Sequence, residues 1–125
     1  MGESYDSHHD FFDPRHYRKD KGTTELIDNG KRNRMATVLW YLSDVEEGGE
    51  TNFPVGKTGE MPRDYTACSG LKVKPAAGKV ILFYDMRADG SLDRHSLHGA
   101  CKVVEGVKWA ANKWVWSEPM HFMQT

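Results

Sequence analysis

The chain has 125 residues, which fits one domain over residues 1–125 with enough sequence for a core and little to spare. Its formal net charge is −1, so no positive field draws it to nucleic acid or to an acidic membrane surface. No apolar run is long enough to cross a bilayer, which excludes direct membrane insertion of this segment.

The first predicted strand covers residues 5–12, with the sequence YDSHHDFF. Because side chains alternate along a strand, His8 and Asp10 point to one side and His9 points to the other. An imidazole and a carboxylate aimed at one point are potential metal ligands. An isolated H-x-D triplet is more often a solvated turn, so the motif alone leaves both interpretations open.

Residues 13–33 are polar and contain proline and glycine, which predicts a loop with a short helical turn near residues 24–27. The charges indicate a solvated surface, and His16 has no partner pattern around it. Because this loop follows the candidate metal-binding strand, it could also close over a site as a lid.

Residues 34–44, RMATVLWYLSD, predict the clearest strand because they are β-branched and aromatic and lack glycine and proline. Thr37 and Tyr41 share one face, which suits the wall of a polar cavity. The other face, which begins at Val38, is more apolar, and we expect it to pack between sheets. Tyr41 could equally be an ordinary buried tyrosine with a satisfied hydroxyl.

The middle of the chain predicts short strands and loops. A glycine pair in residues 46–54 indicates a bend before a short strand, and residues 55–70 predict a long loop. Residues 71–75 and 79–85 predict two strands joined by PAAG. The second is an almost continuous apolar run, as is typical of a central strand, and residues 86–93 form a turn.

Residues 96–116, SLHGACKVVEGVKWAANKWVW, place Lys108 in an aromatic-rich strand pattern that begins after His98. Lys108 shares a strand face with Trp114 and Trp116. If that face points inward, Lys108 needs an anion, and no acidic residue lies nearby on the same strand. Alternatively, Lys108 lies at a strand end with its ammonium group in solvent.

Strands dominate these predictions, and no amphipathic helix of three turns is apparent. The pattern predicts an all-β fold, either an antiparallel sandwich or a jelly-roll barrel. Two cysteines, Cys68 and Cys101, permit one disulfide but do not require it.

Four segments together resemble the prolyl 4-hydroxylase branch of the 2-oxoglutarate- and iron(II)-dependent dioxygenases. They are YDSHHDFF, RMATVLWYLSDVEEGGETNFP, VKPAAGKVILFYD and SLHGACKVVEGVKWAANKW, and they cover most of the chain. The resemblance implies a double-stranded β-helix (a jelly roll) that lacks the helices and strands preceding this segment in the family. It implies hydroxylation of peptidyl proline with Fe(II), O2 and 2-oxoglutarate, releasing succinate and CO2, with ascorbate as a further cofactor.

The resemblance also implies an iron site. His8, Asp10 and His98 match the two-histidine, one-carboxylate ligand set of the family, whereas His9 and His95 do not match it. Three ligands on one face of Fe(II) leave positions open for the cosubstrate and oxygen.

The same resemblance assigns further residues to the cosubstrate. Lys108 matches the lysine that pairs with the distal carboxylate of 2-oxoglutarate, which would supply the missing anion. Tyr41 and Thr37 match hydroxyl positions that assist the same carboxylate.

Three more positions match contacts to a proline-rich peptide or protein substrate: Tyr5, Arg34 and Trp114. Aromatic walls suit such a peptide in the polyproline II conformation. Arg34 by itself would ordinarily be a surface charge at a strand edge. Trp116 stands where the family has a histidine, which puts the choice of substrate in doubt.

Cys68 and Cys101 match cysteines of relatives in the secretory pathway. The resemblance therefore implies a disulfide and an endoplasmic reticulum or secretory location, with a membrane anchor possible in a preceding segment. Two alternatives remain at this point. One is a related hydroxylase of another substrate, and the other is an inactive barrel fragment that binds a metal or peptide without turnover.

Overall fold

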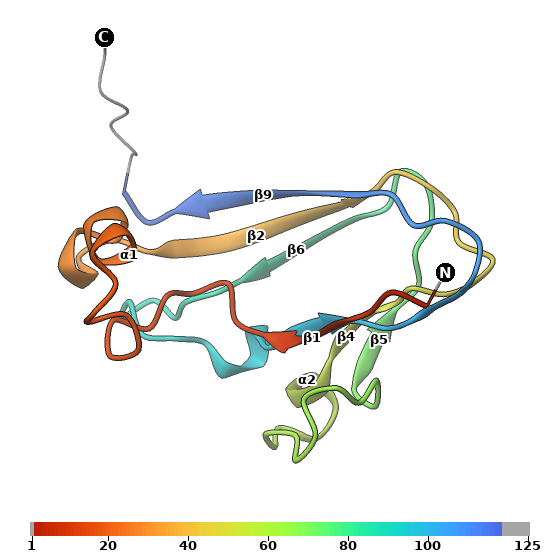
Figure 1. Ribbon diagram of the computed structural model, residues 1–125, viewed down its shortest axis with the longest axis horizontal. Coiled ribbons are helices and arrows are strands. Elements are labelled where there is room, and N and C mark those ends of the chain that lie inside the picture. Colours follow the sequence, from red (N-terminus) through yellow and green to blue (C-terminus); the bar gives the residue numbers. More distant parts are fainter. Residues whose placement is uncertain (1, 119–125) are drawn as a thin grey trace, which may run out of the picture.

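The computed structural model describes residues 2–118 (Figure 1). In chain order the elements are β1 (Tyr5–His8), α1 (Lys21–Leu26), η1 (Asp28–Gly30), β2 (Arg34–Tyr41), β3 (Glu47–Gly48), β4 (Thr51–Phe53), α2 (Pro54–Thr58), β5 (Leu71–Val73), β6 (Val80–Tyr84), η2 (Arg94–Ser96), β7 (His98–Ala100), β8 (Val103–Glu105) and β9 (Ala110–Trp116). None of the helices in this part of the chain has the length and apolar character needed to cross a membrane.

Two sheets form the layers of the fold (Figure 1). The first has the strand order β1-β7-β4-β5 and the second has the order β6-β2-β9, while β3 and β8 form a separate pair. Every pair of these strands is antiparallel. This arrangement confirms the predicted all-β class and the double-stranded β-helix, because two antiparallel sheets of short strands face each other.

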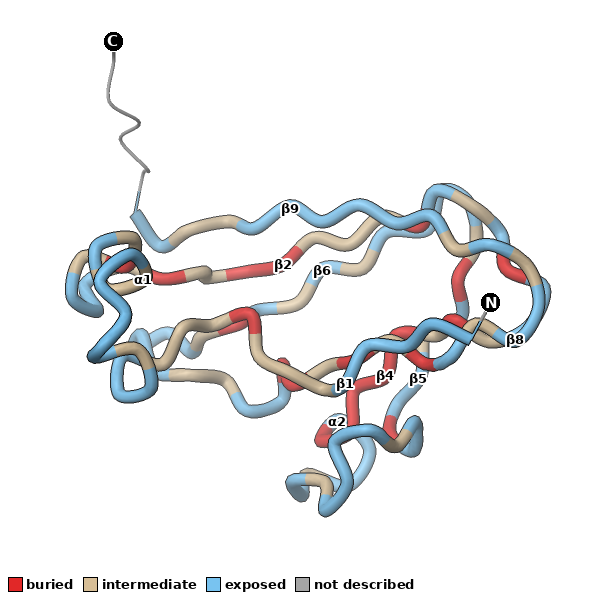
Figure 2. The backbone as a smooth tube through the Cα atoms, in the orientation of Figure 1, coloured by how far each residue is buried: buried red, intermediate tan, exposed pale blue. Residues whose placement is uncertain are grey.

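The inward face of β2 is the polar one. Thr37 and Tyr41 are buried between the sheets, whereas Val38 and Trp40 on the other face are only partly buried (Figure 2). The prediction that the more apolar face packs between sheets is wrong, since Leu42 on that face is 59% exposed. The polar hydroxyls can be buried because they are hydrogen-bonded, so side-chain polarity alone does not identify the inward face.

Strand β6 lies at the edge of its sheet among the described residues, where its one neighbour is β2. The prediction of a central strand is therefore wrong. Its apolar run alternates in exposure, and Leu82 and Tyr84 are each 59% exposed on the outer side. A continuous apolar run predicts burial on both faces, but here only one face meets the opposite sheet.

The first strand is shorter than predicted, because β1 ends at His8 and the chain bends at Asp10. Strand alternation therefore does not bring His8 and Asp10 together. The bend beyond the strand end does so, and it turns the carboxylate of Asp10 back between the two sheets, where only 6% of the residue is exposed.

The two short α-helices have clear local causes. Asp20 caps α1, since its Oδ1 accepts a hydrogen bond from the Thr23 amide at 3.1 Å. This helix confirms the predicted helical turn, a few residues earlier than expected. Helix α2 falls in the region predicted as a loop; it begins at Pro54 and ends before Gly59, whose φ is 77°.

Gly48 allows β3 and β8 to approach closely. Its φ is +82°, and a Cβ atom there would collide with the carbonyl oxygen of Lys102 and the amide nitrogen of Val104. Gly78 has almost the same φ, +83°, but a Cβ atom there would meet open space. A side chain at either glycine would strain the backbone, but only a side chain at Gly48 would also collide with a neighbouring strand. Comparing substitutions at the two positions therefore distinguishes the two effects.

We expect Gly48→Ala to lower the free energy of unfolding by about 3 kcal/mol, because left-handed strain adds to displacement of the partner strand. Gly78→Ala should lose only about 1 kcal/mol, from strain alone. Urea unfolding measures both values. Equal losses in the two variants would mean that β3 and β8 do not constrain Gly48.

Candidate functional site

Three side chains converge at the end of β1. His8 lies directly opposite His98 in the pairing of β1 with β7, and Asp10 follows at the bend. The Nε2 atom of His8 is 3.4 Å from Asp10 Oδ1, and that of His98 is 3.7 Å from Asp10 Oδ2. One ligand atom from each of the three lies within 4.8 Å of the others. Two imidazoles and a carboxylate so close together fit a metal such as Fe(II).

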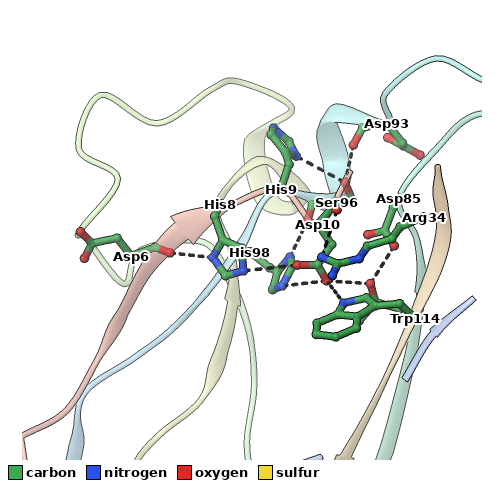
Figure 3. A network of polar contacts seen from close by, with 11 residues as sticks. Asp6, His8, His9, Asp10, Arg34, Asp85, Asp93, Ser96, His98 and Trp114 are labelled. Atoms are coloured by element: carbon green, nitrogen blue, oxygen red, sulfur yellow. Dashed lines mark hydrogen bonds and ion pairs between the residues drawn. The ribbon is translucent and has the colours of Figure 1, made fainter. Parts of the chain in front are cut away.

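Backbone carbonyls orient both imidazole rings (Figure 3). The Nδ1 of His8 lies 2.9 Å from the Asp6 carbonyl oxygen, and the Nδ1 of His98 lies 2.7 Å from that of Ser96. A carbonyl oxygen only accepts, so each Nδ1 carries a hydrogen, and in the neutral form of each ring Nε2 keeps a lone pair. This is the tautomer that a metal ligand needs.

Burial and charge act differently on the two rings. Burial alone would lower the pKa of His8, but the Asp10 carboxylate and the Asp6 carbonyl beside the ring favour its protonated form and raise the pKa overall. For His98 burial dominates and lowers the pKa, although the Asp10 charge opposes it. His98 is therefore held neutral, which is the form that binds a metal.

Asp10 is held as a carboxylate by donors from the facing sheet. Its Oδ2 accepts hydrogen bonds from Thr37 Oγ1 at 2.7 Å and from Trp114 Nε1 at 3.1 Å. Burial would raise the pKa of Asp10, but His8, His98 and these two donors lower it well below its usual range. The Oδ1 atom has neither of these two donors.

The other nearby histidines lie outside this cluster. The Nδ1 of His9 is 3.4 Å from Ser96 Oγ, and Figure 3 shows its ring turned away from His8. His95 pairs with Asp93, and 61% of its side chain is exposed. The structure thus brings together His8 and His98 and leaves the other two aside.

A cleft of about 620 Å³ extends from the cluster to Lys108. Lys108 is half-buried just before β9, and its Nζ lies 5.6 Å from the centre of the Tyr41 ring. Within residues 2–118, no carboxylate lies within 4.0 Å of that ammonium group. Burial lowers the pKa of Lys108, with the Glu50 charge opposing. A half-buried cation without a partner beside an open cleft is suited to an anionic ligand.

Two hydroxyls near Lys108 are bonded to each other. The Tyr41 hydroxyl contacts Thr51 Oγ1 and lies 3.3 Å from the Val73 carbonyl oxygen. Thr51 is buried on β4 and lines the cleft, and sequence reasoning missed it. Its only signal was its position in a short strand after a glycine pair. Thr37, predicted beside the same carboxylate, has its hydroxyl bonded to Asp10 and Asp85 instead.

Aromatic residues and an arginine form another wall of the cleft. Tyr5, Arg34 and Trp114 all line it, and so does Tyr17 from the predicted loop. The Arg34 guanidinium lies 3.8 Å from the Trp114 ring centre. A register irregularity between Arg34 and Ala36 accounts for this contact, because it turns Arg34 to the same side as Thr37.

The Trp116 ring lies outside the cleft lining. It stacks on Phe12, with the ring centres 6.3 Å apart and an angle of 25° between the planes. Cys68 and Cys101 lie side by side, with their Cα atoms 5.6 Å apart, one in the loop before β5 and the other just after β7.

The chain is similar to known proteins over most of its length. The model of the 2OG-Fe(II) oxygenase superfamily matches residues 1–116. Probable prolyl 4-hydroxylase 9 and prolyl 4-hydroxylase 13 of Arabidopsis thaliana are 45% and 44% identical over 117 residues. Each alignment covers 92% of this chain but only 37% and 39% of the respective relative, so the chain spans well under half of their length.

A solved structure gives the same picture. The viral collagen prolyl hydroxylase from Paramecium Bursaria Chlorella virus-1, determined as a 2OG complex, aligns with a TM-score of 0.62 and 31% identity. The alignment covers 90% of this chain and 51% of the viral chain. The predicted resemblance to this family is confirmed at the level of both sequence and fold.

We expect His98→Ala to weaken manganese(II) binding by at least about 100-fold, because it removes one of three converging ligands. His95→Ala is the matched control, and its affinity should stay within about 2-fold of the original, since its side chain is exposed and outside the cluster. Isothermal titration with manganese(II) measures both. Similar losses in the two variants would contradict the ligand set.

Proposed function

Because the chain belongs to the 2OG-Fe(II) oxygenase superfamily, we propose that the protein is a peptidyl prolyl 4-hydroxylase that uses Fe(II), O2 and 2-oxoglutarate. One observation supports this most strongly. A cluster of two imidazoles and a carboxylate opens into a cleft that is also lined by Lys108, whose ammonium group has no carboxylate within 4.0 Å among residues 2–118. These are the groups needed to hold a metal ion and a dicarboxylic acid side by side.

In this proposal His8, Asp10 and His98 hold Fe(II), and Lys108 pairs with the distal carboxylate of 2-oxoglutarate. The bonded hydroxyls of Tyr41 and Thr51 lie near the same carboxylate, whereas Thr37 supports Asp10. Fe(II) with 2-oxoglutarate would supply the oxidation of proline by O2, with release of succinate and CO2. The side chains of the cleft would orient both for this reaction.

The substrate in this proposal is a proline-rich peptide or protein. Tyr5, Arg34 and Trp114 present aromatic and cationic surface along the cleft, which fits an extended polyproline II segment. The names of the Arabidopsis relatives and of the viral enzyme support the same reaction. Ascorbate would serve as a reductant, as in the family resemblance.

Turnover by the chain tests the proposal. With Fe(II), 2-oxoglutarate and a poly-proline peptide, succinate and hydroxyproline should form together, and omission of the peptide should abolish hydroxyproline and reduce succinate. An anaerobic titration of Fe(II) with 2-oxoglutarate should give the charge-transfer band of the chelate. Succinate without hydroxyproline would indicate a hydroxylase of another substrate, and the absence of the band would contradict an oxygenase.

We expect Lys108→Met to weaken 2-oxoglutarate binding by about 50-fold, because a carboxylate loses its charged hydrogen-bond partner. Lys113→Met is the matched control. Lys113 lies on β9, is exposed, and is opposite Val38 on the outer face of the sheet. The anaerobic titration measures both affinities. Unchanged 2-oxoglutarate affinity in Lys108→Met would show that Lys108 is misassigned.

We also propose that the protein works in the endoplasmic reticulum or secretory pathway, where disulfides persist. The support is the pairing of Cys68 with Cys101 across a sequence separation of 33 residues. Protein purified without reductant should show no free thiol after denaturation, and Cys68→Ser should show one. We expect Cys68→Ser to lose about 3 kcal/mol of stability. Two free thiols in the original chain would contradict this proposal.

A further inference from the structure

A second buried carboxyl lies behind the candidate ligand set. Asp85 follows β6 and is completely buried. Its side chain makes one hydrogen bond among the described residues, from Oδ2 to Thr37 Oγ1 at 2.7 Å, and its Oδ1 has no partner there. No lysine, arginine or histidine nitrogen of residues 2–118 lies within 4.0 Å of it. A buried carboxylate without a neighbouring cation is rare, so the burial of Asp85 needs an explanation.

Counting hydrogens gives that explanation. The Thr37 hydroxyl carries a single hydrogen, yet its oxygen lies 2.7 Å from both Asp10 Oδ2 and Asp85 Oδ2. Two ionised carboxylates can only accept, so the hydroxyl could satisfy only one of them. The other pair of oxygens would then face each other at hydrogen-bond distance without a hydrogen between them. One of the two carboxyls must therefore be protonated.

The surroundings decide which carboxyl holds the hydrogen. Asp10 accepts a second hydrogen bond from the Trp114 N–H, and a second donor on the same carboxyl favours its ionised form. Within the described part of the chain, Asp85 has no donor besides the Thr37 hydroxyl. Burial raises the pKa of Asp85 to about 7, with the Asp10 charge adding to the effect and the Thr37 bond and the Arg34 charge opposing it. The hydrogen therefore belongs to Asp85.

We propose that Asp85 is a positioning residue whose protonated carboxyl donates to Thr37, so that the Thr37 hydroxyl in turn donates to Asp10 Oδ2. Trp114 donates to the same oxygen from β9. Two donors therefore occupy Oδ2 and leave Oδ1 without either of them, so Oδ1 is the oxygen through which Asp10 would hold a metal. The inference rests on the proposed function only in taking Asp10 as a metal ligand.

Infrared difference spectroscopy locates the hydrogen. At about pH 6 the exposed carboxyl groups are ionised, so the difference between the original chain and Asp85→Asn should contain the stretch of a protonated carboxyl. This band should shift in heavy water, and it should persist when the chain is loaded with manganese(II). A difference spectrum without that band would mean that Asp85 is ionised and would overturn the proposal.

Manganese(II) affinity tests the positioning role. Asp85→Asn keeps an N–H donor for Thr37, so its dissociation constant should stay within about 2-fold of the original. Asp85→Ala and Thr37→Val break the chain of hydrogen bonds and should each weaken binding about 10-fold. Because Asp85 acts through Thr37, the double variant should be no weaker than Thr37→Val alone. Circular dichroism checks that each variant is folded, and Thr37→Ser, which keeps the hydroxyl, should bind normally.

Two patterns would overturn this inference while leaving the metal site intact. One is an equal loss in Asp85→Asn and Asp85→Ala, and the other is normal binding by Asp85→Ala. A failure of the original chain to bind manganese(II) would instead remove Asp10 as a ligand, and with it both this inference and the proposed function. Since binding is measured without 2-oxoglutarate or peptide, a failure to hydroxylate proline does not affect the test.

Discussion

The burial of one carboxylate, Asp10, links the two sheets of this fold. The residue comes from the end of β1, yet its hydrogen-bond donors Thr37 and Trp114 come from β2 and β9 in the facing sheet. A buried carboxylate is costly unless hydrogen-bond donors reach it, so the sheets must keep the separation and register that bring these donors to Asp10. The geometry of the candidate metal ligands therefore depends on how the two sheets pack, and a change in the packing would also change that geometry.

The sequence was sufficient for the fold class and for the identity of the converging residues, but not for the way in which they meet. Strand alternation predicted that His8 and Asp10 share a face, whereas β1 ends at His8 and a bend delivers Asp10. His98 joins them because β1 pairs with β7, and this long-range pairing places it opposite His8. Local patterns carry no information on which distant strands pair. The prediction that His98 joins His8 and Asp10 therefore depended on the resemblance to the family.

The same reasoning explains the residues that sequence patterns missed or placed incorrectly. Thr37 was expected at the cosubstrate, yet its hydroxyl is bonded to Asp10 and Asp85. Thr51 and Asp85 lie on or beside other strands, and no local pattern marked either side chain as part of the site. Each of these side chains is buried because of partners across the sheet or between sheets, and such partners are set by register rather than by the residue's neighbours in sequence.

Trp114 connects the candidate metal ligands with the surface proposed for the peptide. One edge of its indole donates to Asp10 Oδ2, its face carries the Arg34 guanidinium, and 39% of the residue remains exposed along the cleft. A peptide that packs on this ring therefore contacts a group that also orients a metal ligand. Substrate contact and ligand orientation are thus not separable at this residue: a change at Trp114 alters the Asp10 carboxylate as well as the cleft wall. Arg34 does not bond to the Asp10 carboxylate. Its guanidinium donates instead to the backbone carbonyl oxygen of Asp10, at 3.4 Å. Of the two, Arg34 is the residue through which the peptide surface can vary while Asp10 keeps its side-chain donors.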